Sequence, residues 1–115
     1  MRQRTLVQSI SLSGVGLHSG ERVDMTIAPA DPDTGVRFTV GGGDPIQAHA
    51  LNVTTTQLGT NLANSKGETV ATVEHFLAAC SGLGVDNVAV ELSAPELPIL
   101  DGSSAPFCVA LRDAG

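Results

Sequence analysis

The sequence contains very few aromatic residues and few basic ones. Its 115 residues include three phenylalanines but no tryptophan or tyrosine, so aliphatic side chains must fill most of any core. Six lysines and arginines stand against twelve aspartates and glutamates, which gives a net charge of −6. Because sequence-independent phosphate binding needs clustered lysine and arginine, the composition argues against nucleic acid as a partner.

Long hydrophobic runs and paired-cysteine motifs are also absent. No apolar stretch approaches the roughly 20 residues that cross a bilayer, so we expect no transmembrane segment. The basic start is a poor signal peptide, because glutamine and serines interrupt its apolar residues. Cys80 and Cys108 lie in apolar segments without CxxC spacing, which favours two buried free thiols in a reducing cytoplasm over a disulfide.

Several short stretches alternate between apolar and polar residues, which is the pattern of half-buried strands. These stretches lie near residues 6–13, 23–27, 36–40, 46–50 and 88–92. The glycine-rich sequence GVGLHSG joins the first two, and we expect it to close a hairpin. The threonine-rich stretch NVTTTQLGTNLAN is also prone to β-structure.

Two further stretches have the spacing of helices. Apolar residues at positions 73, 76, 77 and 80 predict a helix from Thr72 to about Ser81, with Thr72 as its cap and glycines at its end. A final helix is expected to begin near Ala105-Pro106, capped by Ser103 or Ser104. The order of elements predicts one α+β domain over residues 1–115, a mainly antiparallel sheet layered with two helices.

The segment TVEHFLAAC places a carboxylate beside an imidazole in apolar surroundings. On a helix Glu74 and His75 point about 100° apart, so they cannot chelate one ion as an i,i+4 pair would. They could divide the work of a metal hydrolase, with His75 binding the metal and Glu74 taking a proton from metal-bound water. On pattern alone, a solvated or hydrogen-bonded polar pair at the start of a helix is favoured over this catalytic interpretation.

The other histidines do not complete a metal site from the sequence alone. A zinc site needs three or four ligands, and no HxxxH, HExxH or HxxxD motif accompanies His18, His49 or His75. On pattern alone His18 belongs to a glycine-rich turn, and His49 faces outward from a strand without a function. Asp101 most simply forms a turn before the last helix.

Four segments together carry a resemblance to a known family: QRTL, GVGLHSG, TVEHFLAACSGLGVDN and APELPILDGSSAPF. In order and spacing they resemble the amino-terminal domain of UDP-3-O-acyl-N-acetylglucosamine deacetylases, the zinc-dependent enzymes of lipid A biosynthesis. The likeness covers essentially all 115 residues. It implies two similar α+β halves with the active site between them, of which this chain resembles the first.

The resemblance also implies roles for individual residues. Glu74 matches the general base that activates zinc-bound water for attack on the N-acetyl carbonyl, and His75 matches a zinc ligand. Asp101 matches a conserved turn with a mainly structural role. The positions that match substrate-binding segments are Leu17, His18, Leu58, Gly59 and Thr60.

In the family the remaining zinc ligands form an HxxxD motif in the second half, which is missing here. We therefore expect an amide hydrolase domain with an incomplete Zn²⁺ site. It would bind UDP-3-O-acyl-N-acetylglucosamine only with its missing C-terminal domain and would be inactive alone. One alternative is a non-catalytic binding or scaffold domain of the same fold. Another is self-association through a face of small residues: Ala71, Ala78, Ala79 and Gly82.

Overall fold

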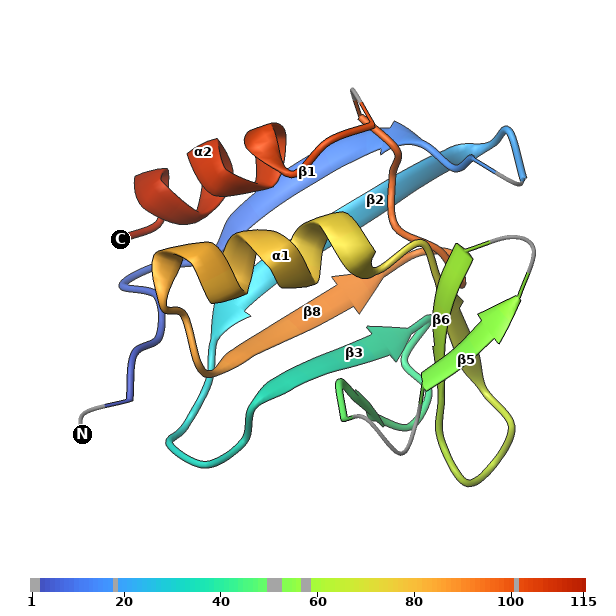
Figure 1. The fold of residues 1–115 in the computed structure, drawn as a ribbon, viewed down its shortest axis with the longest axis horizontal. Helices are drawn as coiled ribbons and strands as arrows, with labels where there is room; N and C mark the ends of the chain where they lie inside the picture. The colour runs from blue at the N-terminus through green and yellow to red at the C-terminus, as the bar shows by residue number, and fades with distance from the viewer. Residues whose placement is uncertain (1–2, 18, 50–52, 57–58, 101) are drawn as a thin grey trace.

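The computed structural model describes residues 3–17, 19–49, 53–56, 59–100 and 102–115, with the backbone alone described at 54–56, 59 and 60. Two sheets and two helices make up this part of the chain (Figure 1). In chain order the elements are β1 (Ile10–Val15), β2 (Arg22–Pro29), β3 (Val36–Val40), β4 (Ile46–Gln47), β5 (Val53–Thr56), β6 (Gly59–Ala63), β7 (Thr69–Ala71), α1 (Glu74–Leu83), β8 (Val88–Leu92) and α2 (Ala105–Asp113).

The larger sheet has the strand order β1-β2-β8-β3-β4, and the smaller one has the order β5-β6-β7. All described neighbours are antiparallel except β3 and β8, which run parallel. The predicted hairpin forms, with Ile10 opposite Ile27 and Val15 opposite Arg22. The prediction of an α+β fold with mainly antiparallel pairing and two helices is confirmed.

Two details of the strand prediction are wrong. The strand expected over residues 46–50 ends at Gln47 within the described chain. Strand β7 was not predicted at all, because three residues are too few to show an alternating pattern. It forms because β6 supplies its hydrogen-bonding partner, with Leu62 opposite Val70.

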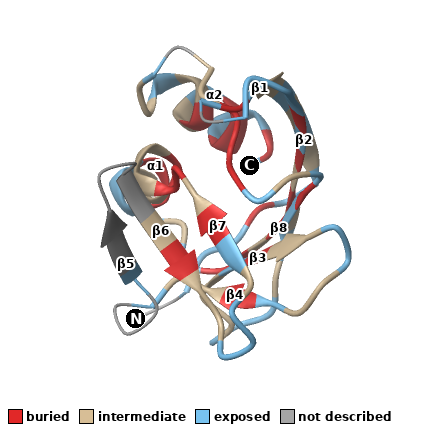
Figure 2. Cartoon of the chain, turned by 90° about the vertical axis from the view of Figure 1, so that its right-hand side faces the viewer, coloured by how far each residue is buried: buried red, intermediate tan, exposed pale blue. Residues whose placement is uncertain are grey.

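Both helices cover one face of the larger sheet, and the core lies between the layers (Figures 1 and 2). The three phenylalanines meet there although they come from β3, α1 and α2. The rings of Phe38 and Phe76 have centroids 6.0 Å apart, and those of Phe76 and Phe107 are 5.5 Å apart, both edge to face. Such pairs add about 0.5–1.5 kcal/mol beyond area burial, so Phe76 anchors α1 between the sheet and α2.

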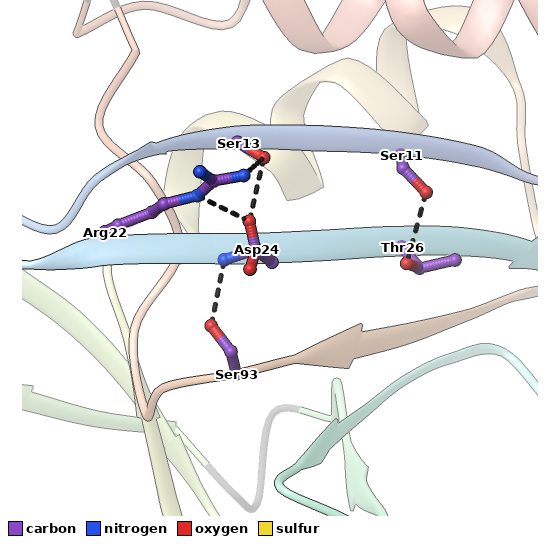
Figure 3. Close-up of polar contacts among 6 residues, drawn as sticks. All are labelled: Ser11, Ser13, Arg22, Asp24, Thr26 and Ser93. Atoms are coloured by element: carbon purple, nitrogen blue, oxygen red, sulfur yellow. Dashed lines mark hydrogen bonds and ion pairs between the residues drawn. The ribbon is translucent and has the colours of Figure 1, made fainter.

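The opposite face of the sheet is polar and exposed. Asp24 on β2 accepts hydrogen bonds from Ser13 Oγ at 2.8 Å and Arg22 Nε at 3.0 Å, as Figure 3 shows. The Ser13 bond, followed by the Arg22 contacts, lowers the pKa of the Asp24 carboxyl. This face therefore has the composition of a solvated surface, and the apolar core lies wholly on the helix side.

Backbone conformation contributes more than side-chain capping to where the two helices begin and end. Neither α1 nor α2 has a side-chain hydrogen bond from its N-cap residue, Val73 or Ser104. Instead the Ser103 hydroxyl accepts a hydrogen bond from the Ala105 N–H at 3.2 Å. The glycine stop of α1 is confirmed, because Gly84 adopts φ 70° and its N–H reaches the carbonyls of the last turn.

Cys80 and Cys108 are both free thiols, as predicted; Cys80 is buried in the core, whereas Cys108 is only half-buried, so the prediction that it is buried is wrong. Burial, and secondarily the neighbouring Cys108, raise the pKa of Cys80 from 9.0 to about 12. None of the helices in the described chain combines the length and the apolar character needed to cross a membrane.

Candidate functional site

Glu74 and His75 form the start of α1 and are both half-buried. The residues on either side, Val73 and Phe76, are completely buried in the core. The adjacent polar pair is thus held between two apolar anchors, and its backbone cannot shift without disturbing the core. A helix begins at this pair of residues, which confirms that part of the prediction. It covers Glu74–Leu83 and begins two residues later than expected.

Thr72 does not cap this helix, so that prediction is wrong. Its backbone is left-handed, with φ 62°, and its side chain is only 4% exposed. A β-branched residue rarely adopts this conformation, because its Cβ approaches the neighbouring carbonyl oxygen. The left-handed residue turns the chain sharply between β7 and α1, and the Thr72 hydroxyl makes no hydrogen bond to the N–H groups that it was expected to cap.

Three buried side-chain oxygens in the described chain have no hydrogen-bond partner. They are Asn61 Oδ1, Thr72 Oγ1 and Glu74 Oε2. All three belong to the junction of β6, β7 and α1, since Asn61 lies opposite Ala71 in the small sheet. Buried polar atoms are normally paired, so their grouping at one junction marks it as a candidate site for an additional ligand or water.

Backbone pairing brings distant segments to this junction. Ala71 lies between Asn61 on β6 and Glu96, in the connection that follows β8. The Ala71 N–H donates to the Pro95 carbonyl at 2.9 Å, and the Leu97 N–H donates to the Ala71 carbonyl at 3.1 Å. Figure 1 shows β6, the start of α1 and this orange connection meeting at one end of the fold.

The turn between β1 and β2 joins the same end. Gly16 forms a bridge with Pro98, and the Ile99 N–H donates to the Val15 carbonyl at 2.9 Å. Leu17 follows this bridge and is 56% exposed, and other large apolar side chains of the described chain, such as Val7 and Val109, are exposed as well. A single exposed apolar side chain is ordinary, so what distinguishes Leu17 is its place beside the bridge to the segment that also pairs with Ala71.

The structure thus groups several of the predicted site residues. Glu74 and His75 begin α1, the backbone of Gly59 and Thr60 begins β6 two residues before Asn61, and Leu17 lies on the bridged turn. His18, Leu58 and Asp101 fall outside the described residues. His49 is exposed beyond the end of β4. The functional roles of these residues stay predictions.

The site is not a complete metal centre by itself. Within the described chain no three residues among histidine, cysteine, aspartate and glutamate group closely enough to hold a metal ion. The face of small residues is also less open than predicted, because Ala79 is buried. Ala78 and Gly82 are exposed and Ala71 is half-buried, so the surface available for self-association is smaller than expected.

Sequence reasoning missed Asn61 and Glu96. Glu96 is only 5% exposed, although it lies in a connecting segment where glutamate is ordinarily solvated. One sequence signal was available, since Glu96 stands alone among the apolar residues of PELPIL. Asn61 gave no signal, because alternation within a threonine-rich strand does not tell which polar residue turns inward.

The chain was compared with known protein families and curated proteins. The family model described as UDP-3-O-acyl N-acetylglycosamine deacetylase matches residues 3–115. Similar proteins named UDP-3-O-acyl-N-acetylglucosamine deacetylase include those of Haemophilus influenzae (strain PittEE) and Histophilus somni (strain 129Pt), each 49% identical over 118 residues. The protein of that name from Neisseria meningitidis serogroup B is 47% identical over 120 residues.

These matches cover 100% of this chain and 39% of each relative. The chain therefore spans about two-fifths of the length of the curated relatives it matches, and each relative contains a large part with no counterpart here.

Proposed function

Because the chain belongs to the UDP-3-O-acyl N-acetylglycosamine deacetylase family, we propose that it supplies one side of a zinc-dependent deacetylase active site. In this proposal Glu74 is the general base, and His75 is one zinc ligand. The substrate is UDP-3-O-acyl-N-acetylglucosamine, the compound in the names of the relatives. The observation that carries the proposal is the buried, unpartnered Oε2 of Glu74 beside His75 at a rigid helix entry.

The environment of Glu74 suits a proton acceptor. A general base must present a free lone pair at a fixed place, and Oε2 is a buried oxygen without a hydrogen-bond donor among the described residues. The neighbouring anchors Val73 and Phe76 restrict movement of the backbone that carries it. Glu74 would accept the proton of the attacking water at Oε2, and the proton that the leaving amine needs would come from a general acid in the part that this chain does not match.

The residues present fit a partial zinc site. Zinc accepts imidazole nitrogen, and half-buried His75 at the start of α1 offers one such ligand beside an unpartnered carboxylate oxygen. When bound, zinc polarises the amide carbonyl and lowers the pKa of its water. Since no three ligands group in the described chain, the others would come from the part of the relatives that this chain does not match.

The substrate would lie between the turn that carries Leu17 and the start of β6 with Gly59 and Thr60; His18 and Leu58, which lie outside the described residues, are proposed to bind it as well. Leu17 supports this arrangement, because it is exposed and follows Gly16, which bridges Pro98 in the segment that also bridges Ala71. We further propose that residues 1–115 act as one domain, that a second domain completes the site, and that the enzyme works in the cytoplasm.

A chimera tests the assignment of residues. The 115-residue chain would be joined to the part of the Haemophilus influenzae relative that it does not match, and deacetylation and zinc content would be measured. Glu74→Ala should lower kcat by roughly 10²–10⁴-fold, the usual contribution of a general base. His75→Ala should lower the bound zinc, while Glu91→Ala, an exposed residue on β8, should change neither quantity.

The isolated chain provides the complementary test. It should bind zinc weakly and show no turnover, because one ligand cannot fix the metal. Measurable deacetylation by the pure 115-residue protein would contradict the proposal, as would full activity of the Glu74→Ala chimera. A non-catalytic scaffold would be indicated if His75→Ala changed neither zinc affinity nor stability in the chimera.

A further inference from the structure

The connection between β8 and α2 contains a buried acidic residue that the proposed chemistry does not use. Glu96 is 5% exposed, and its Oε2 accepts a hydrogen bond from the Ser19 N–H at 3.0 Å. The two residues are 77 positions apart in the sequence. A buried carboxylate is expensive unless it is hydrogen-bonded, so its place in a connecting segment needs an explanation.

The backbone around Glu96 links two parts of the candidate site. On one side Glu96 bridges Ala71, three residues before Glu74. On the other side Pro98, two residues further along, bridges Gly16 at the start of the turn that carries Leu17. Because neighbouring strands lie about 4.8 Å apart, this segment separates the turn from the strand leading into α1 by roughly 10 Å.

The turn is shaped around the Glu96 carboxylate. A Cβ atom at Gly16 would lie 2.5 Å from Glu96 Cδ and 2.7 Å from Oε2, so any larger residue would force the Glu96 carboxylate to move. Within the turn the Gly20 N–H donates to the Gly16 carbonyl at 3.0 Å, and the Glu21 N–H donates to Ser19 Oγ at 3.1 Å. These bonds close the turn on itself, while the Ser19–Glu96 bond fixes it to the rest of the site.

We propose that Glu96 is a positioning residue, whose carboxylate holds the turn after Gly16, and with it Leu17, at a fixed place relative to Glu74 and His75. The consequence of this placement for substrate binding rests on the proposed function. The positioning itself rests on the Ser19 hydrogen bond, the close approach of Gly16 and the two bridges. Glu96 acts through the turn and has no contact with reacting atoms in this proposal.

The isolated chain tests the positioning. Backbone order would be measured by ¹⁵N NMR relaxation in the wild type and in Glu96→Gln, Glu96→Leu and Glu96→Asp. Glutamine keeps an oxygen acceptor of the same reach, so the turn should stay as ordered as in the wild type. Leucine removes the acceptor and aspartate shortens its reach, so the amides of Leu17, Ser19 and Gly20 should fall from order parameters of about 0.85 to below about 0.6.

The internal reference is strand β2, whose Met25 and Ile27 are fully buried. Their order parameters should not change in any of the variants. The proposal is overturned if the turn stays ordered in both Glu96→Leu and Glu96→Asp. It is also overturned if turn and strand loosen together, since that result would indicate a general loss of packing. The aspartate variant keeps the charge and decides the question if the leucine variant does not fold.

The chimera then separates this inference from the proposed function. Glu96→Asp should raise KM roughly tenfold with little change in kcat, because the turn would position substrate and not the reacting atoms. A loss confined to kcat would contradict the positioning role. Full activity of the Glu74→Ala chimera would instead reject the proposed function and leave the relaxation result on the turn intact.

Discussion

Thr72 combines two unfavourable features in one residue. Its φ of 62° is strained for a β-branched side chain, and its buried hydroxyl oxygen has no hydrogen-bond partner. Each feature costs on the order of 1–3 kcal/mol. Such strain persists where the surroundings fix the chain, as they do at Ala71, which is hydrogen-bonded to the 95–97 segment, and at the fully buried Val73.

Thr72→Val separates the hydroxyl from the backbone strain. Valine keeps the shape and the β-branching but removes the unpartnered oxygen, so the free energy of unfolding should rise by about 1 kcal/mol. The measurement is urea unfolding followed by circular dichroism. A decrease would indicate that the hydroxyl binds a buried water, which would change the interpretation of this junction.

Thr5→Val is the matched control for this substitution. The Thr5 hydroxyl donates to the Asn87 carbonyl and accepts the Ala30 N–H at 3.0 Å. Removing it leaves these two groups without their partner, so stability should fall by about 1 kcal/mol. The two threonines should therefore respond with opposite sign to the same chemical change.

At the scale of elements, two glycines near the end of helix α1 differ in conformation. Gly84 is the left-handed C-cap with φ 70°, whereas Gly82 lies within the helix, and an added Cβ there would meet no atom within 4 Å. Gly84→Ala should lower the free energy of unfolding by about 1 kcal/mol, because alanine is strained there. Gly82→Ala should raise it by about 0.5–1 kcal/mol through better helix propensity. Thermal or urea unfolding of both variants checks the opposite signs.

The contact between the β1–β2 turn and the β8–α2 connection gives a second prediction at this scale. Gly16→Ala should destabilise the chain by about 1–3 kcal/mol, because its Cβ would overlap Glu96. In the Glu96→Ala background two of the three nearest atoms are gone, and the remaining one is the movable Ser19 hydroxyl at 2.7 Å. The penalty should then shrink by about 1 kcal/mol or more, as a double-mutant cycle would measure. Additive effects would contradict the close approach of these two elements.

For the whole molecule, alkaline stability should report on the buried Cys80. Its pKa is about 12 in the fold against 9.0 for an ordinary thiol, so between these pH values the unfolded chain loses this proton and the folded chain keeps it. Stability is therefore fully present below pH 9.0 and falls as the pH rises towards about 12. The slope should be about −1.4 kcal/mol per pH unit.

The composition makes this measurement clean. The chain has no tyrosine, one lysine and one other cysteine, Cys108, so few side chains besides Cys80 can contribute in this pH range. Unfolding free energies measured by urea titration from pH 8 upward should decline in the wild type and decline much less in Cys80→Ala. An equal decline in both proteins would show that another group controls alkaline stability.

The sequence by itself determined the class of the fold and most of its elements. Alternation along β1, β2, β3 and β8 and the helical spacing around Phe76 are local patterns, so they can be read without knowing what each element packs against. The same holds for the glycine that ends α1 and for the adjacency of Glu74 and His75. The spacing and the apolar surroundings of the two cysteines also predicted free thiols, and both are free in the structure.

Only the tertiary structure decided what surrounds those residues. The left-handed Thr72, the parallel pairing of β3 with β8 and the short β7 depend on partners supplied by other segments. Glu96 is the clearest case. Its sequence position predicts a solvated glutamate, and only the structure shows its hydrogen bond to Ser19, 77 residues away. Local patterns fix which elements form, whereas the placement of a site comes from contacts between segments far apart in the chain.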